Sequence, residues 1–131
     1  MKSSLLFVTT CLSAVIFVNF SCAAHDEKTN PGTAKHGGQY TEYEVHHGIE
    51  MVATEAKLVF HMTQHLEPVD MKGSSFKAFI QTDAGMRVLA LQPEGSTLIA
   101  DLPSPLPKGA KIALTGKDAD GHSLQARFVK E

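Results

Sequence analysis

The side chains in this sequence that are best suited to chemistry are histidines and methionines, and most of them lie in one stretch. Five of the seven histidines and three of the five methionines fall within the 36 residues from His36 to Met71. Imidazole nitrogen and thioether sulfur are ligands for soft and borderline transition metals. The candidate metal ligands are therefore His36, His46, His47, His61 and His65. The alternative interpretation is that these are unrelated surface histidines and core methionines.

The identity of the metal is limited by the absence of cysteine from this stretch. The two cysteines, Cys11 and Cys22, lie in or beside the apolar N-terminal run. A Cys-based zinc site or a Cys-containing electron-transfer copper site is therefore not expected in the folded domain. We expect copper, held by imidazoles with a carboxylate or thioether. Zinc is the alternative, because histidine with Glu67 or Asp70 would suit it equally well.

The spacing of the histidines limits which of them can share an ion. His46 and His47 are adjacent, so on an extended strand they point to opposite faces, and we favour His47 as the ligand. His61 and His65 share a face but would lie roughly 13 Å apart on a continuous strand, at about 3.3 Å per residue. A joint site for these two therefore requires a turn near Gln64.

Other potential ligands have simpler interpretations. Met51 and Met62 are in phase with apolar neighbours and are expected in the core. Met71 and Met86 stand beside turns and are candidate exposed thioethers, whereas His122 is expected at the surface.

The first 24 residues are predicted to be a secretory signal peptide, because the apolar run at 5–20 is too short and too poorly flanked for a stop-transfer helix. Cleavage could follow Ala23 or Ala24. A lipoprotein would instead be anchored to the membrane at Cys22. After cleavage, His25 would lie at or next to the new N-terminus, where the terminal amine and imidazole form a second, weaker candidate site for Cu(II); a disordered, charged start is the alternative.

Composition and motifs exclude several functions. The chain has 12 basic and 14 acidic residues, a net charge of −2 and no basic block, so nucleic acid and anionic membrane are not expected partners. It has no nucleophile elbow, phosphate-binding glycine loop or zinc-protease helix motif, so no enzymatic activity is expected. Residues 118–121 lack the further ligands of a calcium loop and predict a hairpin turn.

Short apolar–polar alternations separated by turn residues predict an all-β fold. Residues 25–35 are polar and indicate a flexible linker, and residues 36–131 form one domain. The expected strands are 39–43, 49–53, 57–63, 76–82, 87–92, 97–101, 111–115 and 123–129. Seven or eight short strands at this spacing predict an antiparallel, immunoglobulin-like β-sandwich.

Several motifs occur in an order that suggests a family: His36-Gly37-Gly38, a histidine before the Ile-Glu-Met-Val strand, residues 57–60 leading to His65, Pro68-Val69-Asp70-Met71-Lys72-Gly73, Leu91-Gln92-Pro93, Leu106-Pro107-Lys108-Gly109-Ala110-Lys111 and Gln125-Ala126-Arg127-Phe128. Together they resemble small periplasmic proteins, and domains of efflux-pump adaptors, associated with bacterial resistance to copper, silver, cobalt, zinc and cadmium.

The resemblance implies a periplasmic sandwich that captures or delivers a metal for an efflux system. The histidines that match the shared motifs, and that the resemblance implies as ligands, are His36, His47 and His65. The alternative is a structural adaptor module that docks onto an efflux or envelope complex and binds no metal. Convergence of the histidines would favour the first function. An exposed apolar patch away from them would favour the second.

Overall fold

The computed structural model describes residues 32–44 and 46–131. The predicted signal peptide, both cysteines, His25 and most of the predicted linker lie outside these residues. The part of the chain that is described contains no helical segment with the length and apolarity needed to span a bilayer.

All eight predicted segments are strands, and their observed bounds equal or slightly exceed the predicted ones. The strands are β1 Gln39–Tyr43, β2 His47–Ala53, β3 Lys57–Gln64, β4 Glu67–Pro68, β5 Ser75–Thr82, β6 Gly85–Glu94, β7 Thr97–Asp101, β8 Lys111–Lys117 and β9 Ser123–Val129. The two-residue β4 is the strand that the sequence pattern did not predict.

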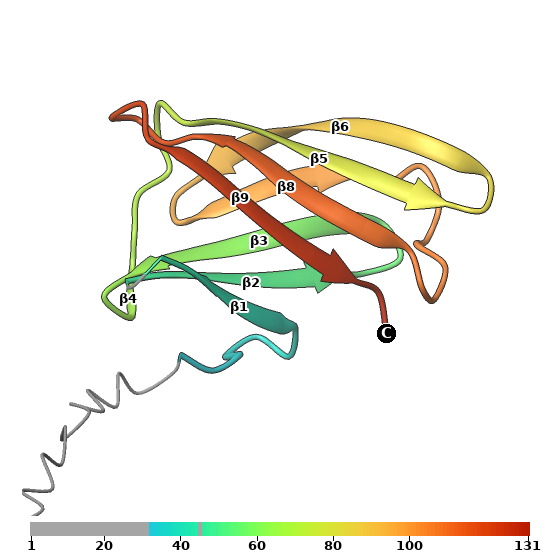
Figure 1. The fold of residues 1–131 in the computed structure, drawn as a ribbon, viewed down its shortest axis with the longest axis horizontal. Coiled ribbons are helices and arrows are strands. Elements are labelled where there is room, and N and C mark those ends of the chain that lie inside the picture. The colour runs from blue at the N-terminus through green and yellow to red at the C-terminus, as the bar shows by residue number, and fades with distance from the viewer. Residues whose placement is uncertain (1–31, 45) are drawn as a thin grey trace, which may run out of the picture.

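The strands form two layers (Figure 1) in the order β1-β2-β3-β7-β6-β5-β8-β9, and β4 pairs with β3. Every pairing is antiparallel. Strands β2, β3, β7 and β6 follow one another as A, B, E and D do in an immunoglobulin domain, and β5, β8 and β9 correspond to C, F and G. Because β6 bonds to both β5 and β7, the layers form one continuous sheet. The sheet is nearly closed, because its end strands β1 and β9 contact each other. The predicted antiparallel β-sandwich is confirmed.

Alternate residues of each strand fill the core between the layers. On β3, Leu58, Phe60 and Met62 are buried, whereas their neighbours in sequence face outward. The Phe60 and Phe128 rings lie 5.9 Å apart and join the two layers. This alternation places His61 on the outer face of β3.

The structure separates the methionines into core and surface residues. Met51 and Met62 are 2% and 3% exposed, so their predicted place in the core is confirmed. Met86 is 68% exposed. The prediction for Met71 is wrong, because the loop after β4 folds back onto the core and leaves Met71 only 3% exposed, with its backbone N–H donating to the Gly95 carbonyl at 2.8 Å.

Candidate functional site

The segment 35–38 crosses the outer face of β2 and is held there by one carboxylate. Glu50 is 4% exposed. Its oxygens accept hydrogen bonds from the backbone N–H groups of Lys35 at 2.9 Å and of His36 and Gly38 at 2.8 Å each. The Nδ1 atom of His36 lies 2.8 Å from Oε2 of the same carboxylate. The burial of this charge is therefore matched by four polar partners.

The two glycines after His36 allow this close approach. Gly37 has a φ of 76°, in the region that favours glycine. A side chain at Gly38 would clash with the backbone carbonyl of Met51. The His-Gly-Gly sequence thus lets the backbone turn beneath the imidazole so that the N–H groups on either side of Gly37 both reach Glu50.

The hydrogen bonds at Glu50 keep its carboxyl ionised. Burial raises the pKa of Glu50, but the hydrogen bonds from Gly38, the His36 ring and the backbone of Lys35 and His36 outweigh it and lower the pKa from 4.5 to about 2. Because the carboxylate can only accept, Nδ1 of His36 carries the proton in the neutral ring. The lone pair is then on Nε2, where it can bind a metal ion.

A second imidazole lies directly against the first. His61 is the cross-strand partner of Glu50, and its ring is stacked on that of His36, with a centroid distance of 3.7 Å and an interplanar angle of 3°. Burial lowers the pKa of His61, the nearby His36 lowers it further, and the charge of Glu50 partly opposes both effects. Because this lowered pKa favours the neutral ring, His61 also offers a lone pair for coordination.

A small cavity adjoins this pair. It has a volume of about 30 Å³, and its lining includes His36, His61, Glu50 and Tyr40. A space of this size can hold a water molecule or a single ion.

A second imidazole pair is built by two neighbouring loops. The rings of His46 and His65 are stacked at 4.3 Å, and the backbone N–H of His65 donates to the His46 carbonyl at 2.8 Å. The non-glycine residues with positive φ in the described ranges all belong to these loops: Glu44 at 53°, His65 at 51° and Leu66 at 67°. The sequence required a turn near Gln64 if His65 was to reach His61. The observed turn instead takes His65 to His46.

His47 lies apart from both pairs. His47 is the first residue of β2, whereas His46 lies in the turn before it, so the two are not neighbours on one extended strand as the prediction assumed. His47 lines a pocket of about 440 Å³ together with Met62, Met71 and the β8–β9 hairpin. The structure therefore places His36, His47 and His65, the three histidines implied by the family resemblance, in three different surroundings.

The β8–β9 hairpin contains the one group of at least three His, Cys, Asp or Glu ligand atoms within 4.8 Å of one another in the described residues: Asp118, Asp120 and His122. The Asp118 carboxylate already accepts the N–H groups of Asp120 and His122, at 3.0 and 2.8 Å, and lies 3.1 Å from the His122 ring. Burial raises the pKa of Asp118, but the hydrogen bonds and charge of His122 and the hydrogen bond from Asp120 together lower it. The cluster forms the predicted hairpin turn, which explains its geometry without a metal.

The outer face of β2 and β3 and the adjoining loops thus carry two stacked imidazole pairs and one buried carboxylate. The two pairs are separate, because His61 lies within β3 and His65 lies in the turn that follows it. Sequence reasoning identified the four histidines but not Glu50, which looked like an ordinary polar residue on the outward face of a strand. No family model, no curated protein and no solved structure matches this chain.

Proposed function

We propose that this protein binds a transition-metal ion, copper in preference to zinc, through the imidazoles of His36 and His61. The observation that carries the proposal is the contact of 2.8 Å between Nδ1 of His36 and the buried Glu50 carboxylate. Metal-binding histidines commonly donate their second ring N–H to a carboxylate, which sets the tautomer and makes the other nitrogen more basic. Glu50 can do this for His36.

The choice of copper follows from the number of ligands at this pair. Zinc in proteins is almost always held by four ligands, or by three and a water. His36 and His61 supply two neutral nitrogens, and the side chain of Glu50 is already occupied by its donors. Cu(I) is satisfied by fewer ligands than zinc, and Cu(II) can complete its shell with water. Because the stacked ring planes are parallel, their in-plane lone pairs are parallel as well, so metal binding requires the His61 ring to rotate toward the ion while Glu50 holds His36 in place.

The His46–His65 pair provides a second, weaker site in this proposal. Both residues are exposed, and the hydrogen bonds described around this pair include no carboxylate that orients either ring. An exposed pair exchanges metal readily with the surroundings. Two sites of unequal affinity on one face suit reversible capture and delivery in the periplasm, in connection with an efflux or resistance system, and require no catalysis.

The test is a calorimetric titration of the purified protein with Cu(II), Zn(II) and, under reductant, Cu(I). We expect the His36→Ala/His61→Ala variant to lose the tighter site and the His46→Ala/His65→Ala variant to lose only the weaker one. Asp118→Asn/His122→Ala controls for the hairpin cluster, and His25→Ala controls for the N-terminal histidine. Binding that persists in both histidine-pair variants and is lost in either control would contradict the proposal.

The alternative function, an adaptor module without a metal of its own, also has an observation in its favour. Met86, Val88 and Val129 are exposed hydrophobic residues on the layer opposite the histidines, and Met86 and Val129 line a groove there.

A further inference from the structure

The outer face of the layer formed by β5, β8, β9 and the adjoining half of β6 combines apolar and basic side chains. Strand pairing aligns Val88, Phe79, Ala113 and Arg127 in one row across this face. The next row contains Met86, Gln81, Lys111 and Val129. Met86, Val88 and Val129 are at least half exposed, so the two rows present apolar side chains to solvent beside the polar Gln81, Lys111 and Arg127.

Every charged side chain that projects outward from β5, β8 and β9 is basic. Alternation along these strands places Lys77, Lys111, Lys117 and Arg127 on the outer face, and none of the three strands contains an acidic residue. None of these four takes part in the ion pairs found within residues 32–44 and 46–131. These four cations are therefore not held in such ion pairs with the described residues.

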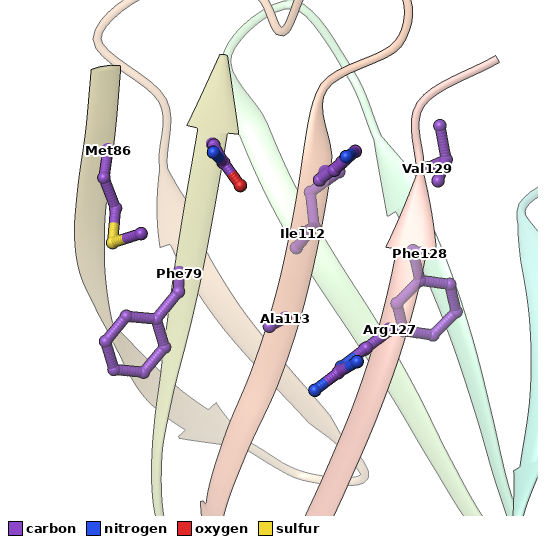
Figure 2. A pocket seen from close by; sticks show the side chains of 9 residues that line it. Phe79, Met86, Ile112, Ala113, Arg127, Phe128 and Val129 are labelled. Carbon is purple, nitrogen blue, oxygen red and sulfur yellow. The ribbon is translucent and has the colours of Figure 1, made fainter.

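The surface is hollowed at its centre. A groove of about 410 Å³ lies over β8, and its lining includes Phe79, Met86, Ala113, Arg127 and Val129. Figure 2 shows Phe79 and Met86 on one side of Ala113 and Arg127 on the other. Because alanine is small, it forms the floor between larger side chains. A large apolar side chain can lie over Ala113 against the Phe79 ring, with Arg127 and Lys111 within reach of a neighbouring carboxylate.

We propose that this groove binds an acidic segment of a partner protein in which large apolar side chains stand beside carboxylates. We infer that the segment is acidic because Lys111 and Arg127, the cations that line the groove, would be left unpaired by an apolar partner and would repel a basic one. The shape of the groove favours a segment with protruding side chains that can fill it. A lipid surface presents no protrusion to fill a hollow, and a protein binds it with protruding apolar residues instead.

The proposal is tested by fluorescence anisotropy of labelled octapeptides with the full chain. The probe alternates leucine and glutamate. A second peptide alternates leucine and lysine, and a third alternates serine and glutamate. Vesicles of three parts phosphatidylcholine to one part phosphatidylglycerol test the lipid alternative. We expect saturable binding of the leucine–glutamate peptide, at least tenfold weaker binding of the other two, and no binding to vesicles.

Variants locate the site. Arg127→Glu is expected to weaken binding of the leucine–glutamate peptide at least tenfold and to strengthen binding of the leucine–lysine peptide. Ala113→Tyr, which fills the groove without changing its charge, is expected to weaken binding of the leucine–glutamate peptide at least tenfold. Lys72→Glu makes the same charge change in the loop before β5 and should alter binding less than twofold. Thermal unfolding confirms that each variant is folded.

Two results would overturn the proposal. One is leucine–glutamate binding that is absent, or that is unchanged in both Arg127→Glu and Ala113→Tyr. The other is binding to the anionic vesicles that exceeds binding to every peptide. Neither result depends on the metal site, since His36 and His61 lie on the opposite layer.

Discussion

Nδ1 of His36 lies 2.8 Å from Oε2 of Glu50, and this contact joins a half-exposed imidazole to a carboxylate whose side chain is only 5% exposed. The contact fixes the tautomer of the ring and attaches the segment before β1 to the outer face of β2. One carboxylate therefore serves both the fold and the proposed metal site, and the two roles can be tested together.

The first prediction concerns Glu50→Gln. The amide keeps one acceptor oxygen, but its NH₂ group faces donors that bond to the carboxylate in the parent protein. We expect copper affinity to fall by about 10-fold or more, the usual effect of removing such a carboxylate. We also expect the free energy of unfolding to fall by about 1–3 kcal/mol, because backbone N–H groups lose an acceptor. Calorimetric titration and urea denaturation measure the two effects.

Glu55→Gln is the matched control, since Glu55 lies exposed in the turn between β2 and β3. This substitution should change neither the copper affinity nor the free energy of unfolding appreciably. If Glu50→Gln bound copper as tightly as the parent, the carboxylate would have no part in orienting His36.

The second prediction is loss of stability in acid. The pKa of Glu50 is 4.5 ordinarily and about 2 in the folded protein, so the unfolded state takes up the proton first as pH falls. The stabilisation is complete above 4.5 and disappears as the pH falls from there toward 2. It amounts to on the order of 2 kcal/mol, after allowance for solvent screening beside the half-exposed His36 ring.

Urea denaturation of the parent and Glu50→Gln at a series of pH values isolates this contribution, because other titrating groups are common to both. The difference in unfolding free energy between them should shrink as the pH falls through this range. A difference that stayed constant down to pH 2 would show that Glu50 has an ordinary pKa.

The strands could be predicted from the sequence because their apolar residues alternate with period two, which directly reflects a half-buried strand. Strand β4 could not, since Glu67 and Pro68 are both exposed and the strand exists only through its pairing with Thr63 and Gln64. The burial of Met71 was missed for a similar reason: its backbone is held by Gly95, in a turn far away along the chain.

The candidate site was predictable in its histidines but not in their pairing. His36 meets His61 only because the register of β2 and β3 sets Glu50 opposite His61 and the segment 35–38 lies across both. Neither the register of the strands nor the path of this segment can be predicted from the spacing of the histidines along the chain. The basic face was missed because its members, Lys77 to Arg127, are spread over three strands and form a cluster only when those strands pair.

The third prediction concerns protonation of His61. Burial, followed by the proximity of His36, lowers the pKa of this ring below its usual 6.5. NMR titration of the ring resonances should therefore show a midpoint for His61 below 6.5. His36→Ala removes both the covering ring and its charge, so the midpoint should rise. His122→Ala, in the distant hairpin, should leave it unchanged. A midpoint unaffected by His36→Ala would mean that the two rings are not stacked in solution.

The fourth prediction tests the strained turn that carries His65. Leu66 has a φ of 67°, a conformation that costs a side-chain-bearing residue about 1–2 kcal/mol, and it is 44% exposed, so its side chain contributes only part of the usual burial energy. Leu66→Gly relieves the strain, although glycine also loses more entropy on folding. We expect these opposing effects to nearly cancel, so that the free energy of unfolding measured by urea denaturation changes by less than about 1 kcal/mol.

Leu66→Ala separates strain from side-chain loss, because alanine removes most of the side chain but keeps the unfavourable φ. It should be less stable than Leu66→Gly by about 1 kcal/mol. Equal stability of the two variants would show that the turn adopts another conformation in solution. The stacking of His65 on His46 would then lack the backbone geometry that produces it, and the second metal site would be expected to disappear from the copper titration.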